Sequence, residues 1–228
     1  HIDHLAQQVV SGGYDLGIAF DGDADRCLAV DEKGVLIDGD QVMAICGMDM
    51  ESRGELPEHT LVATVMSNLG FHIFAKEHGL NLVCTAVGDR NVLEEMERGG
   101  FVLGGEQSGH TIFRKYATTG DGELTALQLL AVLYKQGKKP SEAVSFCVRY
   151  PQTLLNVPVA TKEKKEEIMA SPILRESIAK VERELNGSGR VLVRPSGTEP
   201  LVRVMVEAPE EAEALAKATE LENLIKTL

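Results

Sequence analysis

Three short segments of the sequence concentrate side chains that bind cations, sugar hydroxyls or phosphates. The first reads Asp-Gly-Asp-Ala-Asp-Arg at 21–26 and follows an apolar stretch at 16–20 that predicts a buried strand. Three carboxylates at alternate positions repel one another, by about 1 kcal/mol for each pair at about 4 Å in water. A bound divalent cation reverses this cost, and oxygen ligands favour hard cations. We therefore expect Asp21, Asp23 and Asp25 to hold Mg²⁺ or Ca²⁺, and Mg²⁺ fits best if a phosphate completes its shell.

The same carboxylates allow other interpretations of this loop. An EF-hand would bind Ca²⁺ through them together with Glu32 at its twelfth position, but its sixth position must be glycine and is here Arg26. A phosphohydrolase would use Asp21 as a nucleophile, which only the spacing of the first two carboxylates supports. A solvated acidic turn would bind nothing. Predicted strands flank the loop, which favours the Mg²⁺ interpretation over these three.

The second segment reads Gly-Gly-Glu-Gln-Ser-Gly-His at 104–110, again after a short apolar stretch. Its glycines let the backbone approach a ligand closely, and Glu106 and Ser108 offer groups that bind sugar hydroxyls. Histidine is the side chain suited to moving protons near neutral pH, so His110 is a candidate proton shuttle, although a loop histidine is more often simply hydrogen-bonded.

The third segment, Arg-Pro-Ser-Gly-Thr-Glu-Pro, begins at Arg194 and has the composition of a phosphate-binding loop. The Arg194 guanidinium offers a planar fork of donors, and Ser196 and Thr198 offer hydroxyl groups. Gly197 lets main-chain N–H groups approach an anion, and Arg203 on the following strand adds charge. A plain turn would favour the same Pro and Gly residues, so this segment alone does not decide between the two.

The elements around these segments predict an α/β protein in three parts. Residues 1–34 read as the end of a mixed α/β domain, 35–150 as one complete doubly wound α/β domain, and 151–228 as a small C-terminal α+β domain with an antiparallel sheet. Asp40 is the predicted N-cap of a helix, and the charged run 162–167 is the predicted solvated face of another. In doubly wound folds ligands bind where the strands end.

Composition excludes two classes of partner. The chain has 228 residues with 23 Lys+Arg and 35 Asp+Glu, a net charge of −12, and no Trp, which disfavours binding to nucleic acids. No apolar run reaches the roughly 18–20 residues that a membrane span needs. A phosphate site in so acidic a protein needs cations gathered locally. Five lie in or beside the three segments: Arg26, Arg90, Arg114, Lys115 and Arg194.

The cysteines indicate the cellular location of the protein, and the first residue indicates that the chain is part of a longer protein. Cys27, Cys46, Cys84 and Cys147 are far apart and lie in apolar surroundings, which predicts buried, reduced thiols and a cytoplasmic location. The chain begins at His1 without an initiator methionine, so we expect it to be the C-terminal part of a longer protein. The sequence leaves the oligomeric state open.

The three segments, in this order, resemble the motifs of the α-D-phosphohexomutase superfamily. Further matching runs are TVMSNLG at 64–70, TAVGDR at 85–90 and TTGDGELTALQLL at 118–130, so the resemblance covers essentially the whole chain. Within the superfamily the chain resembles the branch that acts on glucosamine phosphates. That branch carries Gln in GEQSGH, where relatives acting on mannose or glucose phosphates typically carry Met.

The resemblance implies a larger enzyme with four domains around a cleft. The family's first domain carries a phosphorylated serine in a Ser-His-Asn-Pro-type motif, which does not occur in this sequence. On that template the three predicted parts correspond to the end of domain two, domain three and domain four. The N-terminal domains would then be the missing partners of this chain, and we expect the chain alone to be inactive.

The resemblance also implies a role for each matching residue. The three loop aspartates would hold Mg²⁺ together with a phosphoserine oxygen, and Arg26 and His110 would be catalytic, beside the transferring phosphoryl group and as a possible acid or base. The implied substrate-binding residues are Glu106, Ser108, Asp89, Arg90, Arg194, Ser196, Gly197, Thr198 and Arg203.

The implied reaction interconverts glucosamine 6-phosphate and glucosamine 1-phosphate through a phosphoserine and a bisphosphate intermediate, and it supplies an amino-sugar precursor of the bacterial cell wall. A phosphomannomutase or phosphoglucomutase of the same superfamily is the first alternative. A non-catalytic module that binds Ca²⁺ or a sugar phosphate is the second.

Overall fold

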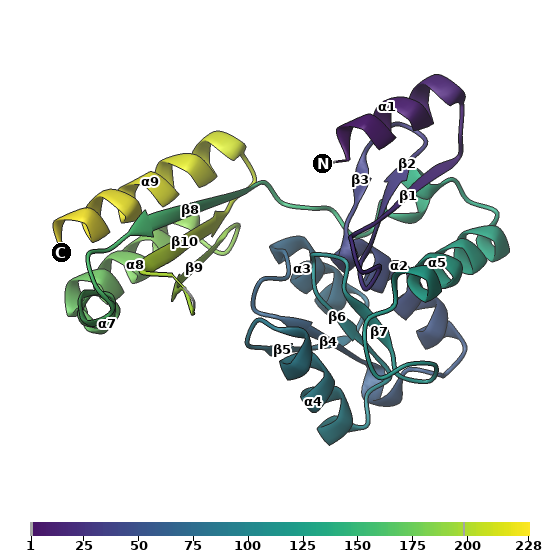
Figure 1. Cartoon of the computed structure of the whole chain (residues 1–228), viewed down its shortest axis with the longest axis horizontal. Coiled ribbons are helices and arrows are strands. Elements are labelled where there is room, and N and C mark those ends of the chain that lie inside the picture. The colour runs from purple at the N-terminus through teal and green to yellow at the C-terminus, as the bar shows by residue number, and fades with distance from the viewer. Residues whose placement is uncertain (1, 198) are drawn as a thin grey trace. The chain divides into compact units, whose positions relative to one another are not determined.

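The computed structural model describes residues 2–197 and 199–228 and divides into two compact units, one ending at Val148 and one starting at Arg149 (Figure 1). Each unit has its own core of buried apolar side chains. Across these two described ranges, no helix has both the length and the hydrophobicity needed to cross a lipid bilayer. Thr198, a predicted phosphate ligand, lies outside the described residues.

The first unit opens with a helix and a three-stranded antiparallel sheet. Helix α1 (Asp3–Gly12) packs against strand β1 (Leu16–Phe20), which pairs with β2 (Cys27–Asp31). The short strand β3 (Leu36–Ile37) pairs with the other edge of β2 and so lies past the end of the first predicted domain. That domain boundary stays a prediction. The acidic segment 21–26 is the tip of the β1–β2 hairpin.

A four-stranded sheet forms the centre of the first unit, in the order β5-β4-β6-β7. Its strands are β4 (Thr60–Thr64), β5 (Asn81–Thr85), β6 (Leu103–Gly105) and β7 (Thr111–Phe113). Strands β4, β5 and β6 run parallel, as predicted, whereas β7 is antiparallel to β6. Strand β7 was not predicted, and it makes the segment 104–110 part of a hairpin.

Helices cover both faces of this sheet, which confirms the doubly wound prediction. Leu61 and Ala63 face a core shared with α2, α3 and α5, whereas Val62 between them faces α4. This alternation follows from the two-residue period of a strand. The helical elements are α2 (Gly39–Ser52), the 3₁₀ turn η1 (Pro57–His59), α3 (Leu69–Glu77), α4 (Asp89–Gly99), α5 (Gly122–Gln136) and α6 (Pro140–Ala143).

The prediction that Asp40 caps helix α2 is wrong. Asp38 is the N-cap, and it forms a capping box in which its side chain accepts from the Gln41 N–H. Asp40 is instead a buried residue of the first turn, and it accepts hydrogen bonds from the Ser67 hydroxyl at 2.8 Å and the Asn68 N–H at 2.7 Å. Asp40 therefore fastens the turn between β4 and α3 to helix α2.

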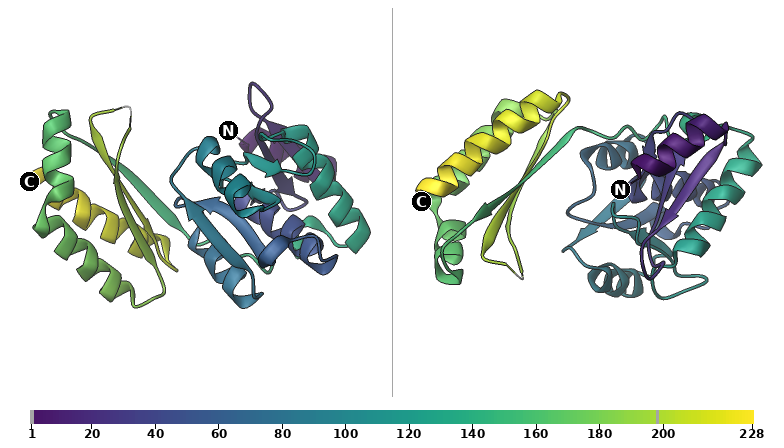
Figure 2. Two further views of the ribbon diagram at one scale, coloured as in Figure 1. Left: turned by 90° about the horizontal axis from the view of Figure 1, so that it is seen from below. Right: turned by 45° about the horizontal axis from the view of Figure 1, so that its top comes forward.

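The second unit is an antiparallel sheet covered by helices, as predicted. The strand order is β8-β10-β9, and the helices pack against one face of the sheet (Figure 2). Val202, Val204 and Val206 of β10 point into the core that this face shares with the helices. The elements are β8 (Gln152–Pro158), α7 (Lys162–Ala170), α8 (Pro172–Leu185), β9 (Arg190–Pro195), β10 (Leu201–Glu207) and α9 (Glu211–Thr227).

Three of the four cysteines, Cys27, Cys46 and Cys147, are buried. Burial raises the pKa of the Cys27 thiol to about 11 and that of Cys46 to about 12, and it raises the pKa of Cys147 as well. The prediction that Cys84 is buried is wrong, because this residue lies exposed on β5, the edge strand of the sheet.

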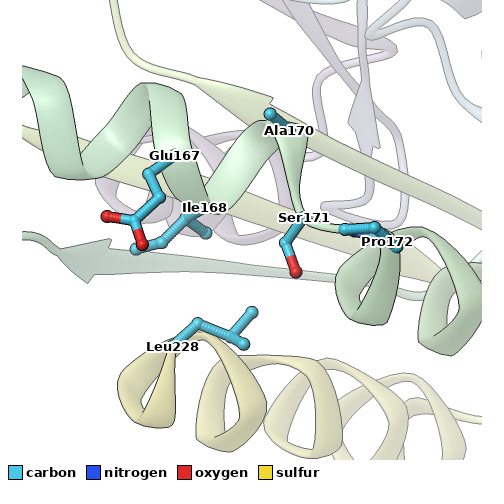
Figure 3. A pocket seen from close by; sticks show the side chains of 6 residues that line it. All are labelled: Glu167, Ile168, Ala170, Ser171, Pro172 and Leu228. Atoms are coloured by element: carbon cyan, nitrogen blue, oxygen red, sulfur yellow. The ribbon is translucent and has the colours of Figure 1, made fainter.

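A pocket of about 310 Å³ lies where α7, the start of α8 and the end of α9 come together (Figure 3). Only Glu167 and Ser171 bring polar side chains to a lining that is otherwise apolar. Among the described residues, none of those predicted to bind a ligand lines this pocket. The remaining lining residues are Ile168, Ala170, Pro172 and Leu228.

Candidate functional site

The three aspartates of the β1–β2 tip converge as predicted. One carboxylate oxygen from each of Asp21, Asp23 and Asp25 lies within 4.8 Å of the others. Ala24, between the last two, adopts a left-handed backbone with φ of 58°, a conformation that a non-glycine residue adopts at a cost. Three converging anionic oxygens are the hard donor set that a small divalent cation takes, so these residues fit Mg²⁺.

His110 lies beside this cluster with both ring nitrogens in hydrogen bonds. Its Nδ1 is 3.0 Å from Asp25 Oδ2, and its Nε2 accepts the N–H of Gly120 at 3.0 Å. Because a backbone N–H can only donate, Nε2 carries the lone pair and the proton of the neutral ring sits on Nδ1. The buried ring therefore orients the Asp25 carboxylate. The predicted acid/base role requires one of these bonds to open and stays a prediction.

Glycines let three backbone segments meet at this point. Strand-like pairing joins Arg26 to His110, and the Cys27 N–H donates to the Gly109 carbonyl at 3.0 Å. A Cβ on Gly109 would lie 2.5 Å from the Cys27 carbonyl oxygen, and one on Gly122 would lie 2.8 Å from the Ala24 oxygen. The acidic tip is thus clamped between the 104–110 hairpin and the start of α5.

Glu106 connects the second segment to the start of helix α4. Its Oε1 accepts the Gly88 N–H at 3.0 Å, and its Oε2 lies 3.4 Å from the Ser108 hydroxyl. This places the first turn of α4, with Asp89 and Arg90, next to Glu106, and the predicted substrate-binding role of these two residues stays a prediction. The Arg90 guanidinium is highly exposed and pairs with a carboxylate on the next turn of its own helix, which raises its pKa.

The cations predicted to gather at the loops do so only in part. The Arg26 Nε lies 3.7 Å from Asp21 Oδ2 at the acidic tip. Arg114 lies at the other end of β7, about 13 Å of strand away from His110, and donates to the carbonyls of Met96 and Phe101. The expectation that Arg114 and its neighbour Lys115 add charge at the second segment is therefore wrong.

In the second unit, two arginines of the third segment face each other across neighbouring strands. Arg194 of β9 is directly paired with Arg203 of β10, on the sheet face opposite the helix-covered core. The Nε atoms of both are buried without a hydrogen-bond partner among the described residues. Burial and the charge of Arg203 lower the pKa of Arg194. Like charges directly opposite destabilise a sheet, so this pair favours a bound anion.

The loop after Arg194 presents donors beside this pair. The Ser196 Oγ accepts the Glu199 N–H at 3.2 Å, so its hydroxyl hydrogen is left to donate elsewhere. A Cβ on Gly197 would meet nothing within 4 Å, so this side of the loop is open to a ligand. The structure therefore places Arg194, Ser196, Gly197 and Arg203 together, and their role as a phosphate anchor stays a prediction.

Sequence reasoning missed Lys165, which lies in the charged run predicted to face solvent. Its side chain is buried and its Nζ donates to the backbone carbonyls of Ser196 at 2.6 Å and Glu199 at 3.2 Å. Lys165 shares a helix face with the buried Ile168, three residues later, and that spacing was the available signal.

The fold and these loops define the class of protein. An α/β unit carries the acidic tip at 21–26, and an α+β unit carries the third segment at 194–200, which we call the cationic loop. The family model described as "Phosphoglucomutase/phosphomannomutase, alpha/beta/alpha domain III" matches residues 38–150, and the model of the C-terminal domain of the same family matches residues 154–224. The chain belongs to the phosphoglucomutase/phosphomannomutase family.

Curated relatives extend the match to nearly the whole chain. The phosphoglucosamine mutase of Caldanaerobacter subterraneus subsp. tengcongensis is 55% identical over 226 residues, which are 99% of this chain and 50% of the relative. That of Lactococcus lactis subsp. lactis strain IL1403 is 54% identical over 93% of this chain and 47% of its own length. The chain thus spans about half the length of the curated relatives it matches.

A solved structure supports the fold. Aspergillus fumigatus N-acetylphosphoglucosamine mutase, crystallised with GlcNAc-6P and magnesium, is 25% identical with a TM-score of 0.78, over 92% of this chain and 48% of that one.

Proposed function

We propose that this chain supplies the metal, sugar and phosphate sites of a phosphohexomutase that interconverts glucosamine 6-phosphate and glucosamine 1-phosphate. The observation that carries the proposal is the convergence of Asp21, Asp23 and Asp25 beside the 104–110 hairpin. The names of the relatives that are more than 50% identical support the amino sugar as substrate.

In the proposed site the first unit acts on the reacting end of the sugar. The three aspartates hold Mg²⁺, as the magnesium complex of the Aspergillus relative also favours. When bound, the cation withdraws negative charge from the phosphoryl group in transfer. Arg26 adds a second positive charge at the same loop, and His110 keeps the Asp25 carboxylate in position.

Glu106 and Ser108 bind sugar hydroxyls in this proposal. The Glu106 carboxylate is already oriented by the Gly88 N–H, so a hydroxyl finds an acceptor whose position is set before binding. Asp89 and Arg90 lie next to it at the start of α4 and are proposed to line the same site.

The phosphate that is not transferred is proposed to bind the second unit. Arg194 and Arg203 supply charge, and Ser196, Gly197 and Thr198 supply hydroxyl and backbone donors. A single anchor of this kind serves both directions of the reaction, because the 1-phosphate and the 6-phosphate sugars each present one phosphate to it. The bisphosphate intermediate can then reorient and return its other phosphate.

The phosphoryl donor in this scheme is the phosphoserine that the family carries in another domain. The motif for it is absent from the sequence, so the chain by itself is proposed to be inactive. The product would serve as an amino-sugar precursor of the bacterial cell wall.

The test is a mutase assay on the full-length protein and on this chain, with the 6-phosphates of glucosamine, glucose and mannose as substrates. We expect the full-length protein to turn over glucosamine 6-phosphate fastest and the chain to be silent. Faster turnover of a neutral hexose phosphate would replace the substrate by that of a phosphomannomutase or phosphoglucomutase. No turnover of any of the three by the phosphorylated, Mg²⁺-loaded protein would favour a non-catalytic module that binds Ca²⁺ or a sugar phosphate.

A further inference from the structure

Lys165 is a buried cation without a carboxylate partner among the described residues. The residue is 8% exposed, and the two acceptors of its ammonium are the backbone carbonyls of Ser196 and Glu199. Its neighbour Lys164, in contrast, pairs with Glu167 at the surface at 3.1 Å. Burying an ammonium costs several kcal/mol unless other groups compensate for the lost hydration. Two neutral carbonyls compensate only in part.

The position of the two carbonyls explains what the ammonium can do. Ser196 and Glu199 lie on either side of Gly197, at the centre of the cationic loop. One ammonium bonded to both therefore ties the two ends of the turn together. Because the carbonyls point to Lys165, the turn is held from the α7 side, while Gly197 is exposed.

The charge of Lys165 adds to an excess of positive charge that the two arginines already create at the loop. Arg194 and Arg203 are paired across the strands, and the carboxylate seen near them is that of Glu199, 3.5 Å from Arg203. Three cations around one loop, in a protein of net charge −12, have their repulsion relieved by a dianionic ligand.

We propose that Lys165 is a positioning residue of the phosphate site, which holds the backbone at Ser196 and Glu199 and supplies a buried positive charge to a bound phosphate monoester. This proposal rests on the proposed function, since it takes the third segment as the phosphate anchor. Lys165 acts through the backbone of the turn, and its charge raises affinity for the anion.

The experiment titrates this 228-residue chain and its variants with glucosamine 6-phosphate and with inorganic phosphate, followed by the NMR shifts of the loop amides. We expect Lys165→Met to weaken binding by about ten-fold or more and Lys165→Arg to recover most of the loss, because Arg keeps a charge and donors. Lys164→Met is the matched control, and we expect it to change binding less than about two-fold.

Hydrogen exchange of the Glu199 amide provides a second readout. We expect this amide to exchange faster in Lys165→Met and at the original rate in Lys164→Met, because only the first variant releases the turn. If Lys165→Met does not fold, Lys165→Gln replaces it, since glutamine keeps N–H donors and removes the charge. In the full-length enzyme the change should raise KM more than it lowers kcat.

Two outcomes overturn the proposal in distinguishable ways. Wild-type chain that binds phosphate, with a folded Lys165→Met or Lys165→Gln variant that binds it equally well, removes Lys165 from the site and leaves the proposed function intact. Wild-type chain that binds neither ligand through the loop amides removes the phosphate anchor itself, and Lys165 with it.

Discussion

The acidic tip of the first unit and the cationic loop of the second have opposite charges, and different contacts hold them in place. Each gathers like charges that repel one another, three carboxylates in one case and two facing arginines in the other. The acidic tip is held by backbone contacts with Gly109 and Gly122, and the His110 side chain adds a hydrogen bond to Asp25. The cationic loop has backbone hydrogen bonds between Ser196, Glu199 and Leu201, and a buried side chain, that of Lys165, holds it in addition.

The difference matches the ligands that we propose for the two loops. A small cation needs three oxygens at fixed separations, and packed backbone sets such separations well. A phosphate is larger and accepts many hydrogen bonds, so a more open turn with surplus positive charge suffices. The tip should therefore be sensitive to changes in shape, and the loop mainly to changes in charge.

The largest effect is expected when the donor set of the tip loses a charge. Asp23→Asn in the full-length protein should lower Mg²⁺-dependent kcat by roughly 100-fold or more, because a neutral amide binds the cation weakly. The exposed Asp15 lies just before β1, and Asp15→Asn is the control. Direct Mn²⁺ binding by the variants provides a readout without turnover. Unchanged turnover in Asp23→Asn would remove this residue from the metal site.

The second largest effect is expected from a change in backbone shape at the tip. Gly109→Ala should destabilise the first unit by roughly 2–4 kcal/mol, since Gly109 has φ of 99° and its added Cβ would lie 2.5 Å from the Cys27 carbonyl oxygen. Gly22→Ala is the matched control, because a Cβ there meets nothing within 4 Å. Urea unfolding measures both. Equal stability of the two variants would contradict the clamped geometry.

The third largest effect is expected when the cationic loop loses a charge. Arg194→Ala should raise the KM of the full-length enzyme for its sugar phosphate by about 10- to 30-fold, the loss expected for one charge-assisted hydrogen bond. Arg183→Ala, on the exposed end of α8, should leave KM unaltered. Steady-state kinetics decide the matter, and a wild-type KM in Arg194→Ala would place the phosphate elsewhere.

The smallest effect is expected at Asp49, a carboxylate whose partners are a lysine and an arginine. Burial alone would raise the pKa of Asp49, but hydrogen bonds from Lys135 at 2.7 Å and Arg53 at 2.9 Å outweigh it and lower the pKa. Asp49→Asn should cost on the order of 1 kcal/mol of stability at pH 7.

The pH dependence of that loss has a definite sign. A lowered native pKa stabilises the fold above the unfolded value of about 4 and stops doing so as pH falls through the native pKa. The difference in unfolding free energy between wild type and Asp49→Asn should therefore shrink below about pH 4. Glu97→Gln, on the exposed side of α4, is the control. A difference that stays constant between pH 7 and pH 3 would contradict this assignment.

The layered fold was readable from sequence because its strands and helices have strong periods. The apolar stretch 16–20 predicted its strand correctly. Strand β7 was missed because three residues carry too little pattern, and its stability comes from pairing with β6. Asp40 was misread because Asp38, two residues earlier, is also a good cap.

The ligand types of the site were readable, and the supports that hold them were not. The carboxylates at 21, 23 and 25, together with the predicted strands that flank them, predicted a cation site. The hydrogen bond from His110 to Asp25 joins residues 85 positions apart, and that from Lys165 to Ser196 joins residues 31 apart. Such pairings depend on tertiary structure, so one sequence does not reveal them.

The uneven burial of the cysteines also gives an experimental handle. Three thiols are buried and their pKa values are raised, to about 11 for Cys27 and about 12 for Cys46, so they react slowly with maleimides at neutral pH. Cys84, in contrast, is exposed on an edge strand. A fluorophore or spin label should therefore attach selectively to β5. The natural sequence thus offers a reporter position on the first unit without any engineered cysteine.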